Sequence, residues 1–172
     1  KRARASVPHS SRGSLQHPQA PRLRHLPHEL QRIRVQRTSS TKLNAIVDEV
    51  RGAADTDKVL VFSSLDNVLY ELAGALELAQ IPYLLYVSGL PQRLRNEYAS
   101  AFSHVPAYRC LLMSTHVGGR GLDLHCATRV ILAQPVWQAD LESQVVKRAW
   151  RMGQTRPVTV STYVMRQTFE EH

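Results

Sequence analysis

The sequence predicts a three-layer α/β fold with a mainly parallel sheet, preceded by a disordered basic arm. From residue 41 onward, short apolar runs typical of buried strands alternate with segments whose apolar residues recur at helical spacing. Strands separated by helices of this length form right-handed βαβ units, which build parallel sheets covered on both faces. With 172 residues, 43% of them hydrophobic, the chain can bury one core. We therefore expect one folded domain, residues 41–172, after an arm of residues 1–40.

The first helical segment begins after Thr41, which we predict to be its N-cap, and its apolar residues share one face. These are Leu43, Ile46, Val47 and Val50. Residues 58–63 are apolar at every central position, as expected of a strand buried on both faces. A second helix is expected after Asp66 as its cap. The further expected elements are a strand at 83–87, a helix at about 92–102, strands at 110–114 and 129–133, a helix at 140–152 and a strand at 158–164.

Functional residues in such sheets lie in the loops beyond the carboxyl ends of the strands. Here those loops are residues 63–64, 88–89, 114–121 and 134–138. We expect any chemistry of this chain to be found there.

The net charge of +8 lies entirely in the arm. Residues 1–40 hold nine lysines and arginines against one acid, Glu29, whereas residues 41–172 hold thirteen of each sign. The arm has no apolar run long enough to bury, so it is expected to be disordered. Binding to nucleic-acid phosphates and service as a solvated linker are both consistent with this composition.

The rest of the composition indicates a soluble intracellular protein. The two cysteines, Cys110 and Cys126, form no C-x-x-C pair and suit reduced thiols. The longest uncharged stretch, residues 78–92, is shorter than a membrane span and contains two prolines, so no membrane partner is expected. Because the chain begins at Lys1 and stops where a new element starts, we expect a fragment truncated at its C-terminus.

A glycine cluster, residues 118–121, follows the strand at 110–114. Its backbone N–H groups suit a phosphate, although on the glycines alone a tight turn is favoured. A phosphate-binding Walker A loop needs a lysine after its last glycine, and no glycine here is followed by lysine. The acidic pair Asp48-Glu49 lies inside a predicted helix and is a poor magnesium site. The chain alone is therefore not expected to hydrolyse ATP.

The predicted helix at 140–152 has an apolar face that would pack on the sheet, formed by Leu141, Val145, Ala149 and Met152. Gln144, Arg148 and Arg151 gather beside that face. Two arginines three residues apart suit an arginine finger, which stabilises charge on a γ-phosphoryl group of a facing domain. From spacing alone, the solvated face of an amphipathic helix is the favoured explanation.

Other candidate residues carry less weight. Trp137 is expected to be buried, whereas packing and an interface or base-stacking role are equally consistent with Trp150. Four possible metal ligands, namely His116, Asp123, His125 and Cys126, lack any recurrent ligand spacing, so no metal is expected.

Three segments, in this order along the chain, together resemble the carboxy-terminal helicase lobe of the Swi/Snf family of DNA-dependent ATPases, in helicase superfamily two. Residues 58–64 (KVLVFSS), 114–124 (STHVGGRGLDL) and 142–154 (ESQVVKRAWRMGQ) resemble the first, fifth and sixth motifs of that lobe. The resemblance covers residues 41–171 and implies a RecA-like fold of the P-loop NTPase type. The sequence is also similar to divergent fungal members near the repair-linked, RING-containing branch, without the Cys/His cluster of a RING.

The resemblance implies a role for each candidate residue. Arg148 and Arg151 would reach ATP across an interlobe cleft as the catalytic pair. The nucleotide side of the cleft would be formed by Gly119, Gly121, Asp123 and Gln144, and DNA would be contacted by Ser63, Ser88, Ser114 and Thr115. ATP with Mg²⁺ would be held mainly by a first RecA-like lobe that this chain lacks, the polymer would be duplex DNA and the location nuclear. The sequence departs from the family pattern at Ser64, at residues 88–90, at Asp123 and at residues 138–139.

Two other classes of protein remain open. One is a non-catalytic nucleic-acid-binding or scaffold module, in which the lobe is a remnant and the basic arm binds. The other is a Rossmann-like enzyme with a cofactor on the glycine loop. That enzyme needs an acidic ribose-binding residue after a following strand, where this chain has Gln134, so it ranks last.

Overall fold

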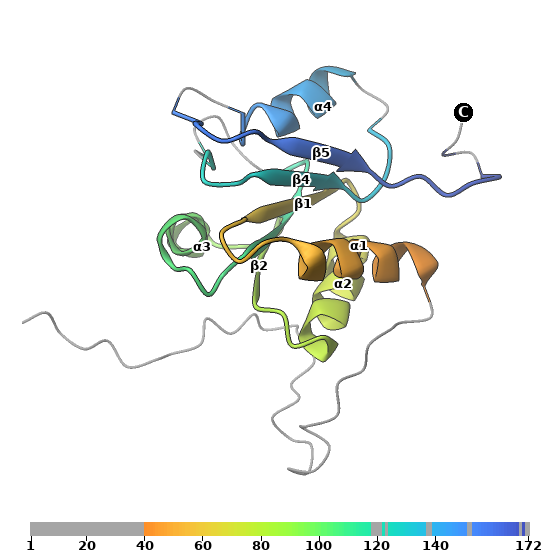
Figure 1. The fold of residues 1–172 in the computed structure, drawn as a ribbon, viewed down its shortest axis with the longest axis horizontal. Coiled ribbons are helices and arrows are strands. Elements are labelled where there is room, and N and C mark those ends of the chain that lie inside the picture. The colour runs from red at the N-terminus through yellow and green to blue at the C-terminus, as the bar shows by residue number, and fades with distance from the viewer. Residues whose placement is uncertain are drawn as a thin grey trace, which may run out of the picture.

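The computed structural model describes residues 40–117, 122, 124–136, 139–150, 153–168 and 170. Within them, helices and strands alternate along the chain except that the strand at 129–132 directly follows the strand at 110–114, and the strands form one sheet (Figure 1). In chain order the elements are α1 (Thr41–Gly52), β1 (Val59–Ser63), α2 (Asp66–Leu78), β2 (Tyr83–Tyr86), α3 (Gln92–His104), β3 (Cys110–Ser114), β4 (Arg129–Leu132), α4 (Ala139–Val146) and β5 (Thr159–Thr162). The expected basic arm, residues 1–40, lies outside the described residues except for Ser40.

The sheet has the strand order β2-β3-β1-β4-β5, and each of its four pairings is parallel. The two strands at its centre, β1 and β3, are buried at every position, as the apolar sequence of residues 58–63 predicts. Strand β5 is at one edge and is largely exposed. The predicted three-layer α/β fold with a parallel sheet is therefore confirmed.

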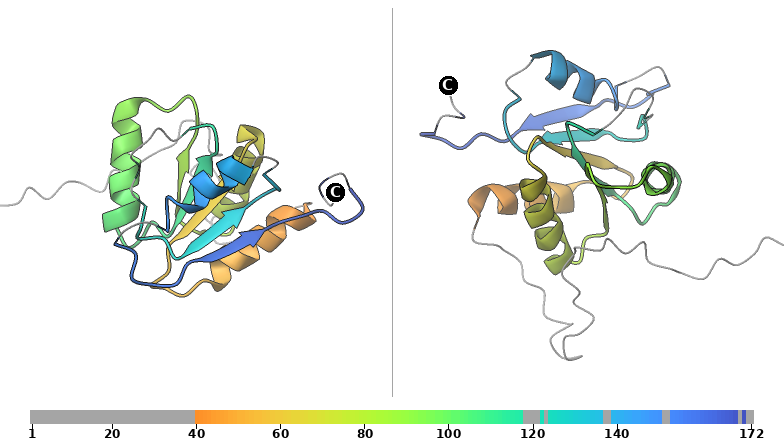
Figure 2. Two further views of the ribbon diagram at one scale, coloured as in Figure 1. Left: turned by 90° about the horizontal axis from the view of Figure 1, so that it is seen from above. Right: turned by 180° about the vertical axis from the view of Figure 1, so that it is seen from behind.

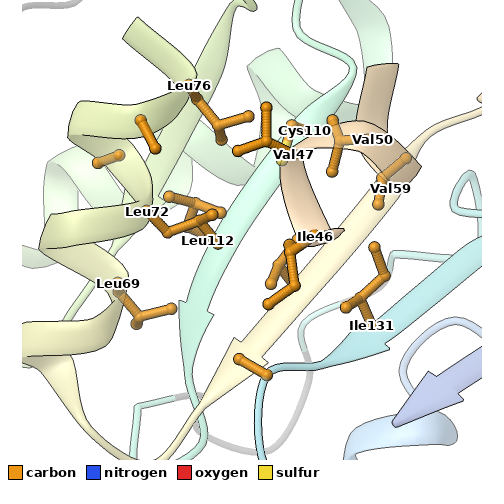
Figure 3. Close-up of a cluster of buried hydrophobic side chains, with 14 of the residues drawn as sticks. Ile46, Val47, Val50, Val59, Leu69, Leu72, Leu76, Cys110, Leu112 and Ile131 are labelled. Carbon is orange, nitrogen blue, oxygen red and sulfur yellow. The ribbon is translucent and has the colours of Figure 1, made fainter. Parts of the chain in front are cut away.

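Successive side chains of a strand point to opposite faces of the sheet, and this alternation divides the core in two. Val59 and Val61 of β1 lie in a cluster with the apolar faces of α1 and α2 (Figure 3). Leu60 and Phe62 alternate with these two valines along β1, and they lie in a second cluster with residues of α3 and α4. Figure 2 shows the two pairs of helices on opposite faces of the sheet.

Two helices begin differently from the prediction. The N-cap of α1 is Ser40, not Thr41, because the Ser40 hydroxyl accepts a hydrogen bond from the Leu43 N–H at 3.4 Å. The N-cap position of α2 is Leu65, which makes no side-chain cap. Asp66 is instead the first residue of the helix, where the positive end of the helix dipole stabilises its carboxylate.

The predicted helix at 140–152 is wrong in its second half. Helix α4 ends at Val146, and residues 147–150 form a turn. In a continuing helix, the Arg148 carbonyl would accept from the N–H of residue 152. Here that carbonyl accepts from the N–H of Leu124 at 3.3 Å, and the preceding bond, from the Arg148 N–H to the Val145 carbonyl, is already of the tighter i to i+3 kind. Arg148 therefore lies in a turn and not on a helix face.

The remaining predicted elements are found with their ends shifted by at most two residues. None of the helices that the structure describes is both long and apolar enough to cross a bilayer.

Candidate functional site

The parallel register brings the carboxyl ends of β1 and β3 together. Ser63 and Ser114, the last residues of the two strands, are paired in the sheet. The backbone N–H of Thr115 donates to the Ser63 carbonyl at 2.9 Å, which extends the ladder by one residue. Three of the four residues predicted to contact DNA thus lie side by side at one edge of the sheet.

Two adjacent hydroxyl groups at this edge are buried and have no hydrogen-bond partner among the described residues. The Ser114 Oγ and the Thr115 Oγ1 make no hydrogen bond to any residue that the structure describes. An unsatisfied buried hydroxyl costs about 1–3 kcal/mol, so such groups are uncommon except where a ligand or a moving segment completes them. The two hydroxyls can therefore donate to an acceptor brought to this edge.

Ser63 differs because its hydroxyl is already used within the chain. The Ser63 Oγ lies 3.0 Å from both the Leu65 carbonyl and the Gln134 Oε1, and it accepts from the Leu65 N–H. The Gln134 Nε2 in turn donates to the Ser64 Oγ at 2.6 Å. The Gln134 amide thus ties the end of β1 to the end of β4. Gln134 was expected in a loop at this edge, but local sequence gives no sign of this role.

Ser88 lies in the loop after β2 and is exposed. Its hydroxyl is 3.2 Å from the Asp66 Oδ2. The loop is held from α3 by Arg95, whose Nη2 donates to the Ser88 carbonyl at 2.7 Å and whose Nε donates to the Leu90 carbonyl at 2.8 Å. Arg95 thereby fixes the backbone of Ser88, a role that the sequence pattern gave no sign of.

The guanidinium of Arg148 lies over the sheet close to its carboxyl edge. Its Nη1 is 3.2 Å from the Met113 Sδ, and its Cζ is 6.0 Å from the centre of the Phe62 ring. Phe62 and Met113 are partners in the sheet, one residue before the ends of their strands, and Tyr86 is the next residue in that row. Arg148 therefore sits above the last buried row before Ser63 and Ser114.

Burial lowers the pKa of the Arg148 guanidinium, and the nearby Tyr86 opposes that shift. An arginine nevertheless stays protonated in proteins, so the group is a half-buried cation. A charge held in a partly apolar setting interacts more strongly with an anion than a charge in water does. This arrangement suits the recognition of a phosphate.

Several predicted site residues lie outside the described residues, namely Arg151, Gly119, Gly121, Asp123 and Trp137. Gln144 is exposed in the last turn of α4, and Trp150, in the turn after it, is 68% exposed. Within the described part of the chain, no three His, Cys, Asp or Glu side chains form a group that could hold a metal ion. Among the described residues, the site thus consists of hydroxyl groups, backbone groups and the half-buried Arg148 guanidinium.

Comparison with known proteins identifies the family of this chain. The sequence model described as the helicase conserved C-terminal domain matches residues 41–153. The DNA repair protein rad8 of Schizosaccharomyces pombe is 33% identical over 138 residues, and an ATP-dependent helicase of the same yeast is 39% identical over 138 residues; each match covers 78% of this chain. A crystal structure of the C-terminal part of the Fun30 ATPase domain matches with a TM-score of 0.73 and 27% identity over 77% of this chain.

The chain spans only a small part of these relatives. It covers 12% of rad8 and 13% of the second yeast helicase, and 43% of the Fun30 chain. The relatives therefore contain much sequence with no counterpart here.

Proposed function

This chain belongs to the helicase conserved C-terminal domain family, among the Swi/Snf-type ATPases, and we propose that it is the second motor lobe of an ATP-dependent DNA translocase. In this proposal a first RecA-like lobe, in the same or another chain, holds most of ATP and Mg²⁺. The second lobe closes over the nucleotide, and cycles of opening and closing move the pair along duplex DNA. The expected setting is DNA repair or chromatin remodelling in the nucleus. ATP supplies the γ-phosphoryl group, whose charge this lobe would help to stabilise.

The observation that carries the proposal is the position of Arg148. Its guanidinium is half-buried above Phe62 and Met113, one row from the carboxyl edge where the functional loops of parallel sheets lie. A rigid cation presented there by a turn fits an arginine finger, which acts on a phosphate bound by a facing domain. Arg151 is proposed as its partner, and Gln144 as a supporting residue.

The two orphaned hydroxyls support the DNA part of the proposal. Ser114 and Thr115 lie next to the end of β1 and carry donors that no described residue satisfies. Hydroxyl and backbone N–H donors are the usual contacts to DNA phosphates. Ser88 and Ser63 are proposed to contribute beside them, and the Ser63 hydroxyl would have to leave its hydrogen bond to the Gln134 Oε1 to do so. Gly119, Gly121 and Asp123 are proposed to face the nucleotide.

The first prediction concerns Arg148. In the intact protein with both lobes, Arg148→Ala should lower kcat for DNA-stimulated ATP hydrolysis by roughly 10³-fold, because an arginine finger acts in the transition state. The KM for ATP should change little, since the first lobe supplies most ground-state binding. Steady-state hydrolysis assays with saturating duplex DNA measure both constants.

Arg148→Lys separates charge from geometry, since lysine keeps the charge but loses the planar fork, and it should restore only a small part of the activity. Arg93→Ala on α3 is the matched control, because the Arg93 side chain is 89% exposed and pairs only with Glu97 among the described residues. Near-normal turnover in Arg148→Ala would refute the assignment.

A further inference from the structure

The side-chain amide of Gln154 holds two segments of the chain together. Its Nε2 donates to the His125 carbonyl at 2.7 Å and to the Ala127 carbonyl at 2.8 Å. The same nitrogen lies 3.5 Å from the Ala149 carbonyl. One amide thus touches the segment after the glycine loop and the turn that carries Arg148.

Those two segments also contact each other directly. The Leu124 N–H donates to the Arg148 carbonyl at 3.3 Å, and the side chains of Leu124 and Ala149 are fully buried in the same core cluster. The segment 124–127 follows residues 114–121 along the chain, which begin with the two orphaned hydroxyls. The turn at 147–150 therefore rests against the far end of the loop whose near end is the proposed DNA contact.

Gln154 is itself fixed from its other side. Gly153, the residue before it, has a φ of +106°. Residues with a side chain rarely adopt this conformation, so the backbone turn before Gln154 favours glycine. The Gln154 Oε1 accepts from the Arg156 N–H at 3.0 Å. The Arg156 side chain then bonds to the Asp57 carboxylate at 2.6 Å and to the Thr56 carbonyl at 2.9 Å. Both ends of the Gln154 amide are thus occupied, and the residue is anchored to the amino edge of the sheet.

We propose that Gln154 is a positioning residue that locks the Arg148 turn to the end of the loop beginning at Ser114. DNA engagement at Ser114 and Thr115 would then change the placement of Arg148, because Gln154 holds the turn to residues 124–127, which follow that contact along the chain. This inference rests on the proposed function, since it assigns to Gln154 the coupling between the DNA contact and the arginine. It adds a residue that touches neither DNA nor nucleotide.

The test is the ratio of ATP hydrolysis rates with and without duplex DNA in the intact two-lobed protein. Gln154→Glu keeps the length and the acceptor for the Arg156 N–H but replaces the donor with a carboxylate that faces carbonyl oxygens. Gln154→Met removes the donor without adding charge. Both should lower the DNA stimulation about 2- to 30-fold, the range for substitutions along a coupling network, with the KM for ATP unchanged. A simple loss of folded protein lowers both rates equally and leaves the ratio unchanged.

Lys58→Met is the matched control, because the Lys58 ammonium bonds to carbonyls at the end of α3 and makes no contact with Gln154. It should lower stability but preserve the DNA stimulation. An unchanged ratio in both Gln154 variants, or an equal fall in Lys58→Met, overturns the inference. A wild-type protein without DNA-stimulated hydrolysis overturns the proposed function instead.

A second measurement does not depend on activity. In this chain, both Gln154 variants should speed hydrogen exchange at the Leu124 amide, whose bond to the Arg148 carbonyl they release, while exchange in β1 stays unchanged. Unaltered protection of Leu124 would contradict the lock itself.

Discussion

At the scale of single residues, the buried carboxylate of Asp57 is stabilised by hydrogen bonds from three side chains. Its carboxylate lies at the amino edge of the sheet and accepts from the Thr128 hydroxyl at 2.8 Å. Arg156 bonds to the same oxygen at 2.6 Å, and Arg129 bonds to the other at 3.3 Å. The hydrogen bond from Thr128 and those from the two arginines hold the pKa of Asp57 below its ordinary value of 3.8, against the opposing effect of burial.

A folded pKa below the unfolded one means that Asp57 stabilises the fold above the unfolded pKa and loses that effect as the pH falls through the folded pKa. Asp57→Asn should therefore lower the free energy of unfolding by about 1–3 kcal/mol at pH 7. The difference from wild type should shrink as the pH falls below about 4, because the carboxyl of the unfolded chain takes up a proton there and the carboxyl of the folded chain does so at lower pH. Urea denaturation at pH 7 and at pH 3 measures it, and a difference that stays constant with pH would contradict the account.

At the scale of elements, the C-terminal end of α3 is capped by a lysine from another part of the chain. The Lys58 Nζ donates to the carbonyls of Phe102, Val105 and Tyr108 and lies 5.2 Å from the centre of the Phe102 ring. The last carbonyls of a helix lack partners within it, and a cation there also interacts favourably with the negative end of the helix dipole. Lys58 thus joins the start of β1 to the end of α3, and burial lowers the pKa of its ammonium group.

Lys58→Met should lower the free energy of unfolding by about 1.5–3 kcal/mol, because hydrogen bonds from a charged donor are lost while the apolar stem is kept. Amide exchange should rise first in the last turn of α3. Arg93→Met, an exposed substitution on the same helix, is the control and should change stability by less than about 0.5 kcal/mol. Equal effects of the two substitutions would show that Lys58 is not a cap.

At the scale of the whole molecule, the fold places the Asp57 cluster and the proposed functional groups at opposite edges of the sheet. The amino edge of the sheet carries Asp57 and its partners, whereas the carboxyl edge carries the orphaned hydroxyls and, one row away, Arg148. The folded part has no net charge, since all of the +8 lies in residues 1–40. Any DNA binding by residues 41–172 must therefore come from local contacts at an edge and not from a general positive field.

Salt titration of DNA binding tests this division. We expect residues 41–172 to bind duplex DNA weakly with a shallow salt dependence, because few phosphates are neutralised. Residues 1–172 should show a steeper dependence if the arm contributes, with a slope of about −0.9 for each neutralised phosphate. Binding by residues 1–40 that equals the binding of the whole chain, with none by 41–172, would favour the non-catalytic module.

Much of the fold was predictable because buried strands and helix faces require apolar residues at regular spacing in the sequence. The apolar run at 110–114 predicted β3 to the residue, and the face of Leu43, Ile46, Val47 and Val50 predicted α1. The site was predictable only as a set of loops. Ser63, Ser114 and Thr115 were expected at one edge, and the parallel register brings them together.

The sequence by itself determined the order of strands and helices along the chain, the two-sided burial of the sheet and the edge where functional loops are expected, because hydrophobic periodicity is a property of neighbouring residues. Only the tertiary structure decided where α4 ends, that Arg148 lies in a turn, and that Gln154 joins that turn to His125 and Ala127, residues 29 and 27 positions away. These outcomes depend on hydrogen bonds to backbone carbonyls of residues distant in the sequence. Such bonds leave no trace in local periodicity, since any residue's N–H or carbonyl can make them.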